Sequence, residues 1–137
     1  MVGLVHGLSI EDRGFLEAFH DRSLSSFGHR DHLKLAWLIM NRHDAEEGLS
    51  VIRTAIREFA EYQGSGNRYH EILTTFWGRI VHHAIQTRPD VPDSDAFLNV
   101  FSSLLDKGLP LRHWTTETLW SEKSRASWTE PDLLPLP

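Results

Sequence analysis

The sequence of 137 residues contains no cysteine, no long apolar run and no excess of basic side chains. Without cysteine the chain has no disulfide framework, no thiolate metal site and no thiol nucleophile. No stretch approaches the roughly 20 apolar residues that a membrane-spanning helix needs. Lysine and arginine number 14 against 19 aspartate and glutamate residues, so the formal charge is −5 and a nucleic-acid partner is disfavoured. We therefore expect one soluble, cytoplasmic domain over residues 1–137 that binds neither nucleic acid nor membrane.

Helical periodicity dominates what the sequence does contain. Apolar residues recur at spacings of three and four behind capping residues such as Ser9 and Asp44, which is typical of amphipathic helices, and no alternating segment predicts a strand. The outer face of the third helix, with Arg53 and Arg57, is expected in solvent, and Ser121 is expected to cap a short helix. The expected helices cover residues 9–22, 28–42, a third segment from 44, 68–87 and about 97–105, with short helical turns around 116–127. The fold class is therefore all-α, a compact bundle of four to five helices with an extended C-terminal segment rich in tryptophan and proline.

Two of these helices place imidazole groups where the pattern expects apolar side chains. His29 and His32 share the apolar face of the second helix, and His70 shares a face of the fourth with Thr74 and Trp77. Burial of such groups without a hydrogen-bond partner costs on the order of 1–3 kcal/mol each. We therefore expect the two polar strips to face each other and to form a pocket between the second and fourth helices.

Three motifs in these segments resemble those of a known protein family. Residues 27–37 read Phe-x-His-x-x-His-Leu-x-x-Ala-Trp, residues 69–74 read Tyr-His-Glu-x-x-Thr, and residues 130–133 read Glu-Pro-Asp-Leu. In this order they resemble a family of small, mainly uncharacterised bacterial all-helical proteins, over roughly residues 15–137. Ile72 stands where that family typically has threonine, so one hydroxyl group is missing here. The resemblance implies an enzyme that acts on a small metabolite, in natural-product biosynthesis.

The residue types in the two strips favour an enzyme with a metal-free acid–base pocket. Histidine suits proton transfer because its ordinary pKa of about 6.5 lies near working pH. We predict His70 as the general base, Glu71 as the residue that orients it, and His29 and His32 as proton donors or ligand-binding groups. Such a site fits a lyase or an intramolecular substitution on a polar, anionic metabolite. The ligand-binding residues expected beside them are Tyr69, Thr74, Trp37 and Arg125, the last as an anion clamp.

Three alternatives stay open at this point. His29, His32, His70 and Glu71 are the right residue types for a divalent transition metal ion, although their spacing matches no known zinc motif. A noncatalytic partner subunit, in a homodimer or hetero-oligomer, would dock through the tryptophan-rich tail. In the third alternative the histidines are hydrogen-bonded core groups. A solvent-connected cavity between the strips would favour the pocket, whereas dry strips and an exposed tail would favour a partner subunit.

Overall fold

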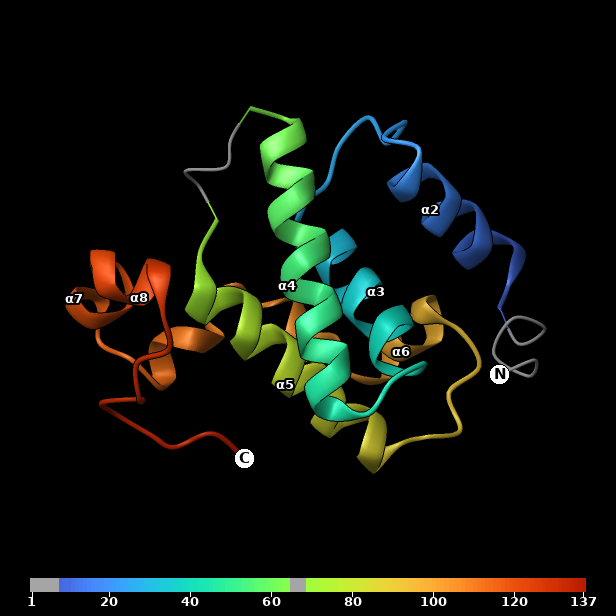
Figure 1. Cartoon of the computed structure of the whole chain (residues 1–137). Coiled ribbons are helices and arrows are strands. Elements are labelled where there is room, and N and C mark those ends of the chain that lie inside the picture. Colours follow the sequence, from blue (N-terminus) through green and yellow to red (C-terminus); the bar gives the residue numbers. More distant parts are fainter. Residues whose placement is uncertain (1–7, 65–68) are drawn as a thin grey trace.

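The computed structural model describes residues 8–64 and 69–137, and all regular structure in this part of the chain is helical (Figure 1). The α-helices are α2 (Ile10–His20), α3 (His29–Met40), α4 (Ala45–Tyr62), α5 (Glu71–Thr87), α6 (Ser94–Val100), α7 (Thr116–Leu119) and α8 (Glu122–Ala126). Two 3₁₀-helices, η2 (Ser102–Leu105) and η3 (Leu109–Arg112), lie between α6 and α7. The predicted all-α helical bundle is confirmed.

Side chains that accept hydrogen bonds from first-turn amides fix where most of these helices begin. Ser9 caps α2, Asp44 caps α4 and Ser121 caps α8, as the sequence predicts. Helix α3 is different, because its N-cap Gly28 has no side chain to offer its first-turn amides. There the carboxylate of Asp31 accepts a hydrogen bond from the Gly28 amide at 3.1 Å. The start of α3 is therefore only half capped.

Helices α3, α4 and α5 form the centre of the molecule, and α2, α6, α7 and α8 lie around them (Figure 1). Helix α3 is the most buried, and its residues from Leu35 to Met40 are all at most 8% exposed. Helices α4 and α5 approach closely at Gly78, where an added Cβ atom would lie 2.6 Å from Cδ2 of Leu49. This close approach places the N-terminal half of α5 beside α4 and α3.

The predicted fifth helix is divided in the structure. Helix α6 ends at Val100, and Phe101 leaves helical geometry with φ −111° and ψ 49° before η2 begins. The ring of Phe101 packs on Phe97 with centroids 5.2 Å apart, and η2 buries Leu104 in the core. Tertiary packing thus overrides the continuous apolar pattern, and the turn that results places a backbone carbonyl group next to α3.

Polar side chains hold the end of the chain against Trp114 and helix α7. Trp114 is fully buried and its Nε1 donates to the carbonyl of Thr129 at 2.9 Å. Asp132 accepts hydrogen bonds from the amide and hydroxyl of Thr115 and from the hydroxyl of Thr118, all between 2.7 and 2.8 Å. The Glu-Pro-Asp-Leu motif therefore contributes a structural clasp. Within the described chain, no helix combines the length and the hydropathy needed to cross a bilayer.

Candidate functional site

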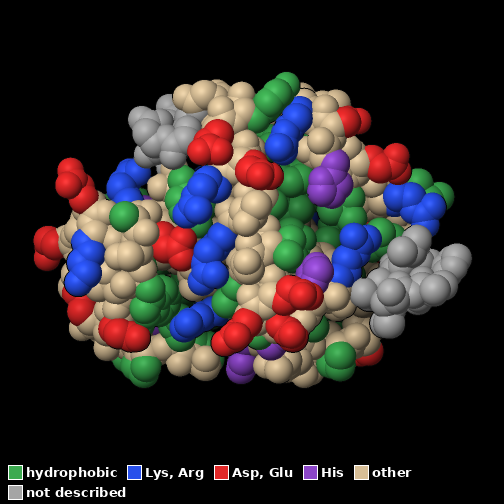
Figure 2. Space-filling view, in the orientation of Figure 1, with side chains coloured by type: hydrophobic (Ala, Val, Ile, Leu, Met, Phe, Trp, Pro, Cys, Tyr) green, Lys and Arg blue, Asp and Glu red, His purple; other side chains and the backbone are tan. Residues whose placement is uncertain are grey.

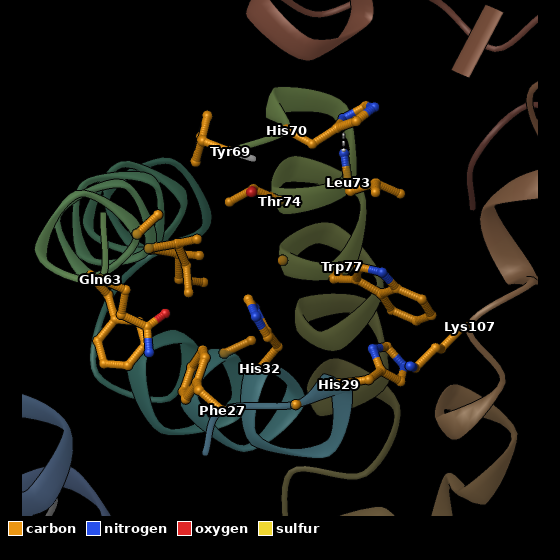
Figure 3. Close-up of a pocket in the computed structure, with 17 residues that line it drawn as sticks. Phe27, His29, His32, Gln63, Tyr69, His70, Leu73, Thr74, Trp77 and Lys107 are labelled. Carbon is orange, nitrogen blue, oxygen red and sulfur yellow. Dashed lines mark hydrogen bonds between the residues drawn. The ribbon is translucent and has the colours of Figure 1, made fainter. Parts of the chain in front are cut away.

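A cavity of about 390 Å³ lies between the start of α3, the C-terminal half of α4 and the N-terminal half of α5 (Figure 3). It is partly open to solvent, and both predicted polar strips contribute to its wall. Its apolar wall consists of Phe27, Ala36, Ile52, Ile56, Phe59, Ala60, Leu73 and Trp77. Its polar groups come from His29, His32, Gln63, Tyr69, His70, Thr74 and Lys107. Among the described residues, no aspartate or glutamate lines this cavity.

His32 is the imidazole that points into the cavity (Figure 3). It is largely buried beside the ring of Phe27, with centroids 4.4 Å apart, and forms no hydrogen bond with any residue that the structure describes. Burial lowers its pKa from 6.5 to about 4, and the neighbouring His29 acts in the same direction. At neutral pH His32 is therefore an uncharged imidazole with an unused lone pair.

His29 lies at the other side of the cavity floor and is held in one orientation. Its Nε2 donates to the carbonyl of Leu104 in η2 at 2.8 Å, which leaves Nδ1 as its proton-accepting atom. Its ring also meets the edge of Trp77, with centroids 4.5 Å apart. The turn after η2 brings the exposed Lys107 beside it (Figure 3). This end of the cavity therefore holds a fixed imidazole and a cation.

His70, the predicted general base, has both ring nitrogens engaged with backbone groups. Its Nδ1 accepts from the amide of Leu73 at 3.2 Å as the N-cap of α5, and its Nε2 donates to the carbonyl of Leu119 at 2.7 Å. The residue is 5% exposed, and burial lowers its pKa. A general base needs a free lone pair. The geometry therefore gives His70 a structural task, which is to start α5 and to fasten α7 to it.

Glu71, the predicted orienting residue, does not orient His70, since no hydrogen bond joins the two residues in the described chain. Its carboxylate accepts from the hydroxyl of Tyr69 at 2.8 Å, from Nε of Arg53 at 2.8 Å and from the hydroxyl of Thr75 at 3.1 Å. Arg53, on the face that the sequence predicts to lie in solvent, is 35% exposed and pairs with this carboxylate, which is only 13% exposed and needs an opposite charge. Basic side chains gather along this border of α4 and α5 (Figure 2).

The predicted ligand-binding residues divide into two groups. Tyr69 and Thr74 line the cavity. Burial raises the pKa of Tyr69 to about 12, with help from its hydrogen bond to Glu71, so its phenol stays protonated. Trp37 instead lies in the core against Phe97, with ring centroids 5.9 Å apart, and Arg125 is exposed on α8. Neither of these two lines the cavity, so the predicted anion clamp at Arg125 is not placed there.

The residues predicted as alternative metal ligands are not grouped around one point in the described structure. Within residues 8–64 and 69–137, no group of three histidine, aspartate or glutamate side chains is placed to hold a metal ion. Backbone carbonyls accept hydrogen bonds from Nε2 of His29 and Nε2 of His70, and Nε of Arg53 donates to the carboxylate of Glu71. Three of the four predicted ligands, His29, His70 and Glu71, therefore serve separate partners.

No family model, curated protein or solved structure matches this chain. The motif resemblance accordingly stays a prediction, and the function is argued from the cavity. Sequence reasoning missed Lys107 and Gln63, which lie outside the two strips. Gln63 is the C-cap of α4, where the pocket meets the end of the helix. Lys107 reaches the cavity after the break between α6 and η2, and the apolar spacing of the sequence does not predict this break.

Proposed function

We propose that this protein is a small-molecule enzyme that performs acid–base chemistry on an anionic metabolite in this cavity. The observation that carries the proposal is His32, a largely buried, neutral imidazole that forms no hydrogen bond with the described residues and points into a solvent-connected cavity. Its ring nitrogens are accessible from the cavity, because the described residues include no fully buried side-chain nitrogen or oxygen that lacks a partner. A titratable side chain with a shifted pKa in a solvent-connected cavity is a candidate for ligand binding or catalysis.

A proton acceptor of this kind supports elimination or intramolecular substitution. In the proposed step the substrate X–H bond breaks, the proton moves to a ring nitrogen of His32, and the electron pair stays on the substrate. That pair either forms a double bond and expels a leaving group from the neighbouring atom, or displaces a leaving group within the same molecule. The imidazolium then returns its proton to the leaving group, which restores neutral His32.

An anionic substrate improves this base at the moment of reaction. Because a nearby negative charge favours the protonated ring, it raises the pKa of His32 from its low value towards working pH. Proton transfer is most efficient when the pKa of the base lies near working pH. Burial therefore keeps His32 unprotonated in the free protein, and a bound anion would strengthen it as a base.

The tail gives less support to the alternative of a noncatalytic partner subunit. Trp114 is fully buried, and the half-buried Trp128 packs against it with ring centroids 5.6 Å apart. Trp120 is 49% exposed, but its ring neighbour is His70, at 5.5 Å. These tryptophans attach the C-terminal segment to the bundle, whereas the strips line a cavity.

The proposal is tested by incubating a mixture of small organic acids with the wild type, His32→Gln and the exposed control His83→Gln. Mass spectrometry then follows the consumption of each acid, and thermal melting checks that each variant is folded. We expect at least one acid to be consumed by the wild type and the control but not by His32→Gln. Equal consumption by His32→Gln, or none by the wild type, would contradict the proposal.

A further inference from the structure

We propose that the ligand is an amphipathic monocarboxylate whose carboxylate lies beside Lys107 and His29 and whose apolar body lies against α4. The inference rests on the proposed function, because it names the substrate class of the same cavity. It differs from the sequence-based expectation of a polar ligand with an arginine clamp. Three properties of the cavity wall lead to it.

The first property is the apolar character of the wall opposite Lys107. Ile52, Ile56 and Phe59 present one side of α4 to the cavity, and Phe27 packs against Phe59 with ring centroids 4.8 Å apart. The aromatic ring system of Trp77 lies across the cavity from them (Figure 3). A wholly polar ligand would lose its hydration on these surfaces without compensation. The wall therefore fits a flat apolar group.

The second property is the sign of the charge. The protein has a formal net charge of −5, yet no acidic side chain lines the described cavity wall, and Lys107 is the cation that does. The start of α3 at Gly28 lies next to His29 and the inward-pointing His32, but the carboxylate of Asp31 in its first turn offsets the positive end of the helix dipole, so the charge argument rests on Lys107. An amine would find no carboxylate on the described cavity wall, and a dianion would find a single lysine there. One negative charge matches the site.

The third property is size. A volume of about 390 Å³ lies towards the lower end of the range of roughly 300–1,000 Å³ that is usual for small-molecule pockets. A single aromatic ring with a short acid side chain is of suitable length, because α4 and Lys107 lie at opposite sides of one cavity (Figure 3). We choose 3-phenylpropionate as the probe and its neutral amide, 3-phenylpropionamide, as the matched control.

The experiment measures the dissociation constants of both probes by NMR titration of the folded wild type and four variants. Lys107→Met removes the cation, and Lys123→Met removes an exposed lysine on α8 as its control. Ile56→Trp fills the cavity from α4, and Val51→Trp places the same side chain at an exposed position of that helix. The indole and imidazole resonances report where each probe binds.

We expect the acid to bind the wild type about tenfold more tightly than the amide, as loss of one charge-assisted contact implies. Lys107→Met should reduce the affinity for the acid to that for the amide, Ile56→Trp should abolish binding of both, and the two controls should behave as the wild type. If the amide binds as tightly as the acid, the cavity remains a ligand site and this inference fails. If neither probe binds in a way that Ile56→Trp abolishes, the inference and the proposed function both fail.

Discussion

Replacement of His32 by leucine is expected to make the protein less sensitive to acid. Burial lowers the pKa of His32 from 6.5 to about 4; His29 acts in the same direction and Asp31 opposes it. Between these pH values the unfolded chain binds a proton that the folded protein does not bind. The free energy of unfolding therefore rises with pH across this window, and stability is lost as the pH falls from 6.5 towards 4.

The size of the effect follows from the same two pKa values. At about 1.4 kcal/mol per pKa unit, the difference between 6.5 and about 4 corresponds to about 3 kcal/mol, of which about 2 kcal/mol is lost between pH 7 and pH 5. Burial also lowers the pKa of His70, which adds a loss of the same sign. That contribution is present in the wild type and in the His32 variant, so it cancels in their difference.

Urea denaturation at pH 7 and pH 5, followed by circular dichroism, measures this difference for the wild type, His32→Leu and His83→Leu. His83 is exposed on α5 and serves as the matched control. The wild type and the control should lose about 2 kcal/mol more than His32→Leu between the two pH values. The same loss in all three proteins would refute the assignment of His32 as a neutral buried imidazole.

Three further predictions concern the structural roles of the motif residues. In urea denaturation, His70→Ala should lower the free energy of unfolding by about 2 kcal/mol, because it removes the cap of α5 and the donor to a carbonyl of α7. His70→Asn should restore the cap and recover about half of this loss. Equal losses in the two variants would contradict the capping role. In a Tyr62→Phe background, the ultraviolet absorbance of the Tyr69 phenolate should titrate near pH 12, and Glu71→Gln should lower that midpoint without abolishing the effect of burial; an unchanged midpoint would exclude the hydrogen bond as a cause. Asp132→Ala should shift tryptophan emission to the red and lower the melting temperature, because the C-terminal clasp is lost; unchanged emission would show that the clasp is dispensable.

The helices and their starts could be predicted from the sequence because they depend on local patterns. Apolar spacing located α2 to α5, and Ser9, Asp44 and Ser121 are side chains that cap a helix wherever they precede one. The same spacing indicated that His29 and His32 face inward, and both line the cavity.

The roles of the individual imidazoles could not be predicted, because their partners are backbone groups far along the chain. The carbonyl that accepts from His29 belongs to Leu104, 75 residues away, and the one that accepts from His70 belongs to Leu119, 49 residues away. A backbone carbonyl leaves no mark in the sequence, since every residue has one. The three inward imidazoles therefore looked equivalent, and tertiary structure alone separates His32, which forms no hydrogen bond with the described residues, from the two that are fixed.

The most direct test of the account is an NMR titration of the His32 imidazole, with and without saturating 3-phenylpropionate. The account predicts that the free protein shows a pKa of about 4 for this ring and that the bound acid raises it. A pKa near 6.5 that the probe leaves unchanged would show that His32 is an ordinary solvated histidine, and would contradict the central claim that it is a neutral base kept for an anionic ligand.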